Sequence, residues 1–117
     1  MENNFDFTFS HIGVNCEDNT DAQAQALLLL ELFGLPVTDG KDSVYSGPCI
    51  EIMKGAGRGE HGHIAIATND IYGAMHMLEK RGIKFDETSA KYGDNGKMIV
   101  IYLQQNIAGF AVHLLQK

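Results

Sequence analysis

Two histidines hold the same place in two similar stretches of the chain. The stretch SHIGVNCED at residues 10–18 and the stretch GHIAIATND at residues 62–70 begin alike, with His11 and His63 each preceding an isoleucine. Apolar residues alternate with other residues in both, a pattern that is typical of a β-strand and places each histidine on the face opposite its isoleucine. Two potential metal ligands would therefore occur at matching positions of two strands.

The elements around these strands repeat as well. In the first half we expect a strand over residues 8–16, a helix over 17–34 that begins near Asp18 and ends at Gly34, and three short strands over 35–54. The acidic and polar residues that precede the helix are typical of an N-terminal cap, and Gly34 suits a left-handed C-terminal residue.

The second half follows the same order. A strand over 62–68 precedes a helix over 71–82, capped by Asn69 or Asp70, and three strands follow over 83–117 with a turn at Asn95-Gly96. We expect one domain over 1–117, with repeat one at about 5–54, a Gly-rich linker at 55–61 and repeat two at about 62–117.

This order of elements resembles the vicinal oxygen chelate superfamily, which includes glyoxalase I, fosfomycin-resistance proteins, extradiol dioxygenases and bleomycin-resistance proteins. The stretches FGLP, LEKRGIKF and YLQQNIAGFAVHL carry the resemblance together with the paired histidines. It implies an α+β fold in which two tandem βαβββ repeats form a curled mixed sheet, an open barrel, around a central pocket with the helices outside.

The resemblance implies four metal ligands, from strands one, four, five and eight: His11, Glu51, His63 and His113. Alternation agrees, because all four have apolar neighbours that would face the helices. Three imidazoles and a carboxylate suit a divalent ion such as zinc, nickel, cobalt, manganese or iron. The alternative is that these side chains are ordinary polar residues in a water-filled pocket.

The last strand departs from the family pattern, because His113 stands where most metal-using relatives have a glutamate. A divalent ion with Glu51 as its single carboxylate keeps about one positive charge, which favours an anionic substrate. Glu51 would then serve both as ligand and as the catalytic base. Glyoxalase I activity and iron-dependent ring cleavage both rely on the replaced carboxylate, so neither is expected.

We therefore predict a metal-dependent lyase or isomerase acting on a small 2-keto or 2-hydroxy acid, or an enediol, bound through two adjacent oxygens. The alternative is a non-catalytic binding or accessory domain. HIGVNCED, IEIMK, GHIAIATNDI and IYLQQNIAGFAVHLLQK resemble the domain appended to some bacterial 2-dehydro-3-deoxy-phosphogluconate aldolases. That likeness implies a setting in sugar-acid metabolism and an aldolase as a partner.

Charge and composition indicate which partners and which cellular location to expect. The net charge of −6 and the lack of a basic run disfavour nucleic acid and anionic membranes as partners. The longest apolar run, Ala26 to Leu30, is far shorter than the roughly 20 residues that cross a bilayer. The acidic start, MENNFDF, is unlike a secretory signal, so we expect a cytoplasmic protein. Cys16 and Cys49 are expected to be reduced and half-buried in the core.

The sequence gives weaker indications about the oligomeric state and about several other side chains. An open curled sheet leaves edges to cover, so a homodimer is expected. His61 suits a second layer around the metal or a solvated loop, and His76 a helix surface. Arg58 and Lys54 could attract an anion or be solvated, and Tyr102 and Gln104 are candidate pocket residues.

Overall fold

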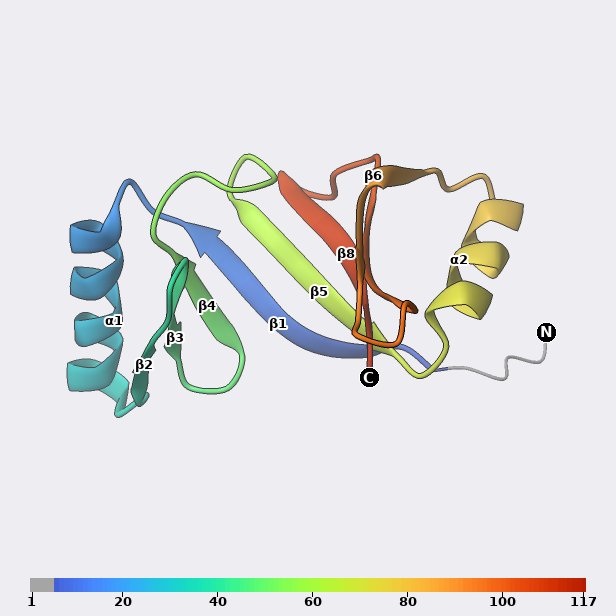
Figure 1. Cartoon of the computed structure of the whole chain (residues 1–117). Coiled ribbons are helices and arrows are strands. Elements are labelled where there is room, and N and C mark those ends of the chain that lie inside the picture. The colour runs from blue at the N-terminus through green and yellow to red at the C-terminus, as the bar shows by residue number, and fades with distance from the viewer. Residues whose placement is uncertain (1–5) are drawn as a thin grey trace.

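The structure is a computed structural model that describes residues 6–117. Two helices and eight strands alternate as the repeat predicts (Figure 1). Their bounds are β1 Thr8–Asn15, α1 Asn19–Phe33, β2 Val37–Asp39, β3 Ser43–Ser46, β4 Ile50–Met53, β5 Gly62–Thr68, α2 Ile71–Lys80, β6 Phe85–Tyr92, β7 Met98–Leu103 and β8 Phe110–Gln116.

The helices begin at the caps that the sequence indicates. The Asp18 carboxylate accepts a hydrogen bond from the backbone N–H of Asp21 at 2.8 Å, and Gly34 closes α1 in a left-handed conformation with a φ of 72°. Asp70 caps α2 in the same way through the backbone N–H of Gly73. The second helix ends at Lys80, two residues before the predicted end, because the chain already turns there with a φ of 89° at Gly82.

All eight strands belong to one sheet with the order β2-β3-β4-β1-β5-β8-β7-β6. The order is symmetrical about the middle: β1 pairs in parallel with β4, β5 pairs in parallel with β8, and the antiparallel β1–β5 pair joins the two halves. The fold class predicted from the sequence, two βαβββ repeats in a curled mixed sheet, is confirmed.

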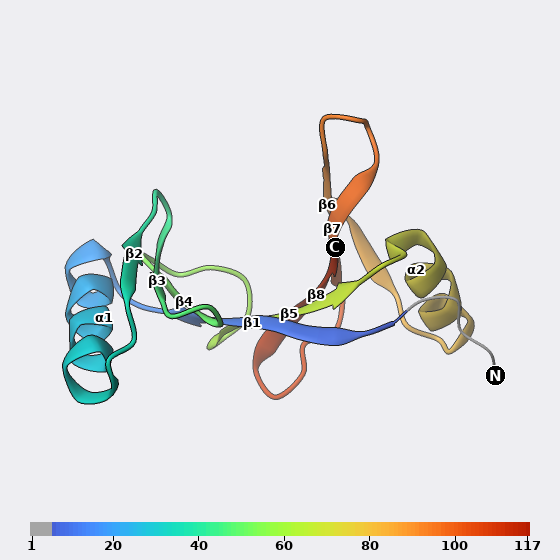
Figure 2. The same cartoon turned by 90° about the horizontal axis from the view of Figure 1, so that it is seen from below.

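The sheet is curled like a trough (Figure 2). Strands β1, β5 and β8 form its floor, the β2–β4 strands and the β6–β7 hairpin rise at its two sides, and each helix lies outside one end. The molecule measures 45 × 29 × 23 Å. Among residues 6–117, no helix is long and apolar enough to cross a membrane.

Two separate apolar cores hold the helices against the convex side of the sheet. Ala22 and Ala26 of α1 pack on Val44 and Ile52, while α2 packs on the sheet through a second cluster that includes Leu114. Small alanines let α1 approach its strands closely. Because the inward and outward faces of each strand alternate, these helix contacts turn the opposite side chains toward the trough.

Candidate metal-binding site

The strand register places the four predicted ligands in two neighbouring rows across the floor of the trough. In one row, Gly13 of β1 lies between Glu51 of β4 and His63 of β5. In the next row, Ala65 of β5 lies between His11 of β1 and His113 of β8. A small residue thus separates two large ones in each row, which leaves room for the imidazoles to lean toward a common point.

The four side chains meet at that point. The Oε1 atom of Glu51 lies 3.1 Å from Nε2 of His63 and 3.4 Å from Nε2 of His11. The three imidazole rings have centroids 5.4 to 5.9 Å apart, and one ring nitrogen from each lies within 4.8 Å of the other two. His63 and His113 are buried, and His11 and Glu51 are half-buried.

Neighbouring groups fix the orientation of these side chains. The Nδ1 of His113 donates a hydrogen bond to the backbone carbonyl of Leu114 at 3.1 Å, so its Nε2 carries the lone pair. The Nδ1 of His11 lies 3.0 Å from the Ser10 hydroxyl. On the far side of the carboxylate, Ser43 donates its hydroxyl to Oε2 of Glu51 at 2.7 Å. Such supporting hydrogen bonds are typical of metal ligands.

The electrostatic state of two of these groups also suits a metal. Burial lowers the pKa of His113 to about 4, so its imidazole is neutral near pH 7. Hydrogen bonds from His11 and His63 hold the pKa of Glu51 well below its ordinary value, against the opposing effect of burial. Neutral imidazole and ionised carboxylate are the forms in which these residues bind a cation.

The donor set fits a borderline divalent ion such as zinc, nickel, cobalt, manganese or iron. Ligand atoms that share such an ion lie roughly 3–4 Å apart, so only small side-chain movements separate the observed arrangement from a bound one. His11, His63, His113 and Glu51 would hold the ion, with Ser43 supporting the carboxylate.

A cavity of about 230 Å³ opens above the four residues. Besides them, it is lined by Asp42, Met53, Lys91, Val100 and Tyr102. The first two come from the β3–β4 side of the trough and the last three from the β6–β7 side, so the two repeats form opposite walls. Tyr102 was a predicted pocket residue, and the structure places it there.

Tyr102 is held between the site and the linker. The centroids of the Tyr102 and His113 rings lie 4.8 Å apart, and the guanidinium carbon of Arg58 lies 4.6 Å from the Tyr102 centroid. Arg58 also forms an ion pair with Asp86 at 3.2 Å. The charge of Arg58 is therefore already matched, and the residue supports a wall of the cavity.

Four other residues singled out in the sequence lie outside the cavity lining. The prediction for Gln104 is wrong: its side chain donates to the carbonyl of Phe85 beyond the end of β7. Lys54 pairs with Asp39 and so holds the β2–β3 turn. His61 is an exposed linker residue whose ring lies 5.7 Å from Phe110, and His76 lies on the exposed surface of α2.

Sequence reasoning missed Ser43 and Lys91. Ser43 faces the trough because it is two residues from Tyr45, which pairs with Glu51, so the alternation of β3 could have revealed it. Lys91 could not be placed in this way. The register of β6 shifts between Asp86 and Lys91, which brings two residues of opposite phase to the same face.

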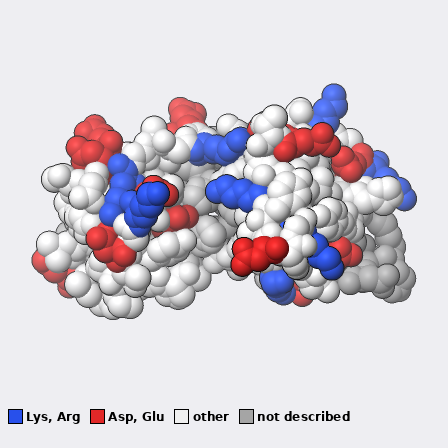
Figure 3. Space-filling model, viewed as in Figure 1, with Lys and Arg blue, Asp and Glu red and all other residues white. Residues whose placement is uncertain are grey.

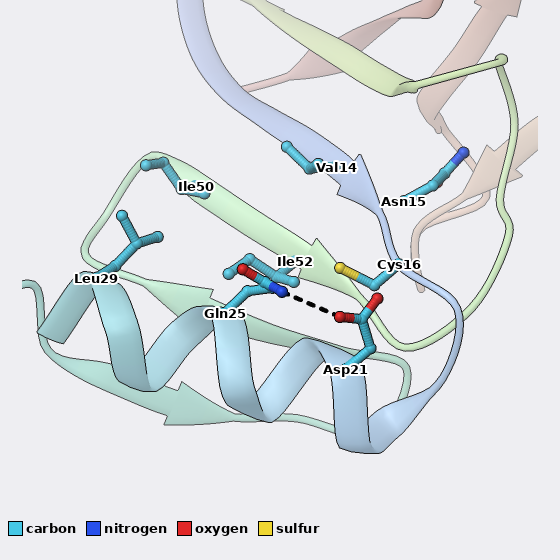
Figure 4. A pocket seen from close by; sticks show the side chains of 8 residues that line it. All are labelled: Val14, Asn15, Cys16, Asp21, Gln25, Leu29, Ile50 and Ile52. Atoms are coloured by element: carbon cyan, nitrogen blue, oxygen red, sulfur yellow. Dashed lines mark hydrogen bonds between the residues drawn. The ribbon is translucent and has the colours of Figure 1, made fainter.

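A larger groove of about 380 Å³ lies on the convex side, between α1 and strands β1 and β4 (Figure 4). Its floor is apolar, with Val14, Ile50 and Ile52. Burial raises the pKa of the Cys16 thiol at its edge, which makes the thiol less reactive. The groove has no convergent ligand set. Cys49, expected to be half-buried, is exposed on the turn before β4.

Comparison with known proteins supports the fold. No protein-family model matches the chain, and no curated protein matches its sequence significantly. Among solved structures, hypothetical protein BH1468 from Bacillus halodurans is similar with a TM-score of 0.67 at 19% identity, over 95% of this chain and 94% of that one.

Methylmalonyl-CoA epimerases are similar as well. The Streptomyces coelicolor enzyme, solved as a variant in complex with 2-nitronate-propionyl-CoA, has a TM-score of 0.65 at 15% identity, covering 93% of this chain and 96% of that one. The Mycobacterium tuberculosis enzyme has a TM-score of 0.64 at 12% identity, covering 92% and 86%. These likenesses show that the chain has the vicinal oxygen chelate, or glyoxalase-like, fold.

Proposed function

We propose that the protein is a divalent-metal-dependent isomerase or lyase. Its substrate would be a small 2-keto or 2-hydroxy acid, or an enediol, held through two adjacent oxygens. One observation carries the proposal: His11, His63, His113 and Glu51 meet on the floor of one cavity, with the carboxylate within 3.4 Å of two imidazoles. Converging ligands in a concave site are the usual sign of a functional metal.

Different residues of the chain would have different roles in the reaction. A bound ion would supply Lewis acidity toward a carbonyl or carboxylate oxygen. Glu51 would act both as a ligand and as the group that accepts a proton from the carbon next to the carbonyl. Ser43 holds the second carboxylate oxygen and so fixes the direction in which Glu51 faces. Tyr102 and the β6–β7 strands form the wall of the cavity beside His113.

Two further observations support this choice. Epimerisation is an isomerisation, so the epimerases among the similar structures favour the isomerase over the lyase within the proposal. The cavity of about 230 Å³ is smaller than the roughly 300–1,000 Å³ of sites for drug-sized ligands, which favours a small acid.

Metal content tests the proposal directly. The protein is purified after supplementation with zinc, nickel, cobalt, manganese or iron, and its metal is measured by mass spectrometry. We expect about one ion per chain in the wild type and in His76→Ala, which changes an exposed helix histidine, and a clear loss in His113→Ala. A wild-type protein without metal under all these conditions would contradict the proposal.

Isotope exchange separates catalysis from binding. The metal-loaded protein is incubated with 2-keto acids in D₂O, and NMR follows deuterium incorporation next to the carbonyl. We expect exchange in the wild type and its loss in Glu51→Gln, which keeps an oxygen ligand but removes the base. Binding without exchange would favour the alternative, an accessory domain related to 2-dehydro-3-deoxy-phosphogluconate aldolases that acts beside an aldolase partner in sugar-acid metabolism.

We also propose that two copies of the chain associate. Several large apolar side chains are exposed on α1 and just after it: Leu27, Leu28, Leu30, Leu32, Phe33 and Val37. The helix contains no Lys or Arg, and the exposed Glu31 is the charged residue that lies among these side chains. The same surface on a second copy is its simplest complement, because a twofold axis buries both at once.

A further inference from the structure

Lys91 lies on the β6–β7 wall of the cavity, opposite the wall that the first repeat forms. It is paired with Val100 across the β6–β7 ladder, and both residues line the cavity. The register shift in β6 turns Lys91 to the trough side, where a regular strand would have turned it to the convex side. The residue therefore lines the same cavity as the imidazoles while remaining exposed to solvent.

The other basic residues near the cavity already have partners. Arg58 is paired with Asp86, and Lys54 with Asp39. Within residues 6–117, the ammonium group of Lys91 forms no ion pair and no hydrogen bond. Lys91 is thus the one cation of the cavity lining with its charge still available. Lys and Arg side chains lie beside the hollowed centre of this face (Figure 3).

The carboxylates of the cavity do not match this charge. Glu51 is engaged with two imidazoles and with the Ser43 hydroxyl. Asp42 lines the cavity from the first repeat, on the wall opposite Lys91, and forms no ion pair with it. An anion above the imidazoles would be repelled from the Asp42 side and attracted to the Lys91 side.

We propose that Lys91 binds a second anionic group of the substrate. This inference rests on the proposed function and narrows it. The substrate would be a small acid with two anionic ends: a 2-keto or 2-hydroxy carboxylate toward the histidines and Glu51, and a carboxylate or phosphate at Lys91. A flexible lysine side chain suits this task, because its compact charge reaches a distal anion without a fixed geometry.

The test compares pairs of acids that differ in the distal group. Cobalt-loaded protein is titrated calorimetrically with 2-oxoglutarate and with 2-oxovalerate, whose distal end is uncharged. A second pair, 3-phosphoglycerate and glycerate, distinguishes a distal phosphate from a distal carboxylate. We expect at least one anionic acid to bind roughly 10- to 100-fold more tightly than its uncharged counterpart.

Variants assign this preference to the lysine. In Lys91→Gln we expect the preference to vanish while metal content and 2-oxovalerate affinity stay unchanged. Lys91→Arg should retain it, and so should Lys97→Gln, which changes an exposed lysine of the β6–β7 turn. Equal binding of both members in both pairs, or a preference that survives in Lys91→Gln, would overturn the inference but leave the proposed function standing. A wild type that binds no metal would overturn both.

Discussion

Ser43 and Ser46 lie in the same strand but differ in their hydrogen bonding. Both are buried, but the Ser43 hydroxyl donates to Glu51 at 2.7 Å, whereas the Ser46 hydroxyl has no hydrogen-bond partner among the described residues. The difference follows from position, since Ser43 faces the trough and lies near the ligand side chains. A hydroxyl that orients a ligating carboxylate typically contributes to metal affinity.

The pair therefore offers a matched test at the scale of single residues. We expect Ser43→Ala to lower metal affinity by roughly 10- to 100-fold, because Glu51 loses the group that fixes its second oxygen. Ser46→Ala should leave metal affinity unchanged, since it removes an unpartnered hydroxyl. Competition titration with a metal-sensitive dye measures both. Equal effects of the two substitutions would mean that Ser43 does not support the site.

What could be predicted at this scale follows from regular alternation. His11 and His63 stand out because two strands begin alike, and the family resemblance implied Glu51 and His113, with which the alternation of their strands agrees. Lys91 was not predicted as a cavity residue, because the irregular register of β6 changes which residues of the strand face the trough. Gln104 was misplaced because β7 ends at Leu103, so a residue one position later no longer follows the strand pattern.

At the scale of elements, adjacent strands allow the ligands to meet only because small residues lie between them. A Cβ atom added to Gly13 would overlap the imidazole of His63. The backbone of Gly13 does not have a positive φ, so the requirement for glycine here is one of space. The caps at Asp18 and Asp70 and the turns were predictable from local chemistry, whereas this contact depends on the pairing of β1 with β5.

This contact gives a test of how the strands position the ligands. We expect Gly13→Ala to displace the His63 ring and to weaken metal binding by at least about tenfold, an effect comparable to the loss of a supporting group. Gly55→Ala is the control, because a Cβ there meets no atom within 4 Å. Metal titration and histidine NMR signals report the two effects. Unchanged metal affinity in Gly13→Ala would show that His63 is not held against β1.

For the whole molecule, the trough places its two helices at the ends and leaves the middle of the convex face uncovered (Figure 2). Ile12 and Ile64, which pair there, are only half-buried, and Phe9 is 57% exposed. The sequence predicted Ile12 and Ile64 to face the helices. No helix reaches the centre of that face, so these side chains remain partly exposed there.

The exposed apolar side chains on α1 and just after it predict self-association. Leu32 is 62% exposed on α1, so Leu32→Lys removes no core contact but would place a charge in the proposed contact between copies. Ile107→Lys changes a residue that is 50% exposed in the β7–β8 loop, away from α1, and serves as the control (Figure 1).

In sedimentation equilibrium we expect twice the 12.8 kDa chain mass for the wild type and for Ile107→Lys. Leu32→Lys should shift toward the single chain, because a lysine buried between two copies loses its hydration without gaining a partner. A wild type that stays at the mass of one chain at micromolar concentration, or a Leu32→Lys variant that associates as the wild type does, would contradict a dimer formed through α1.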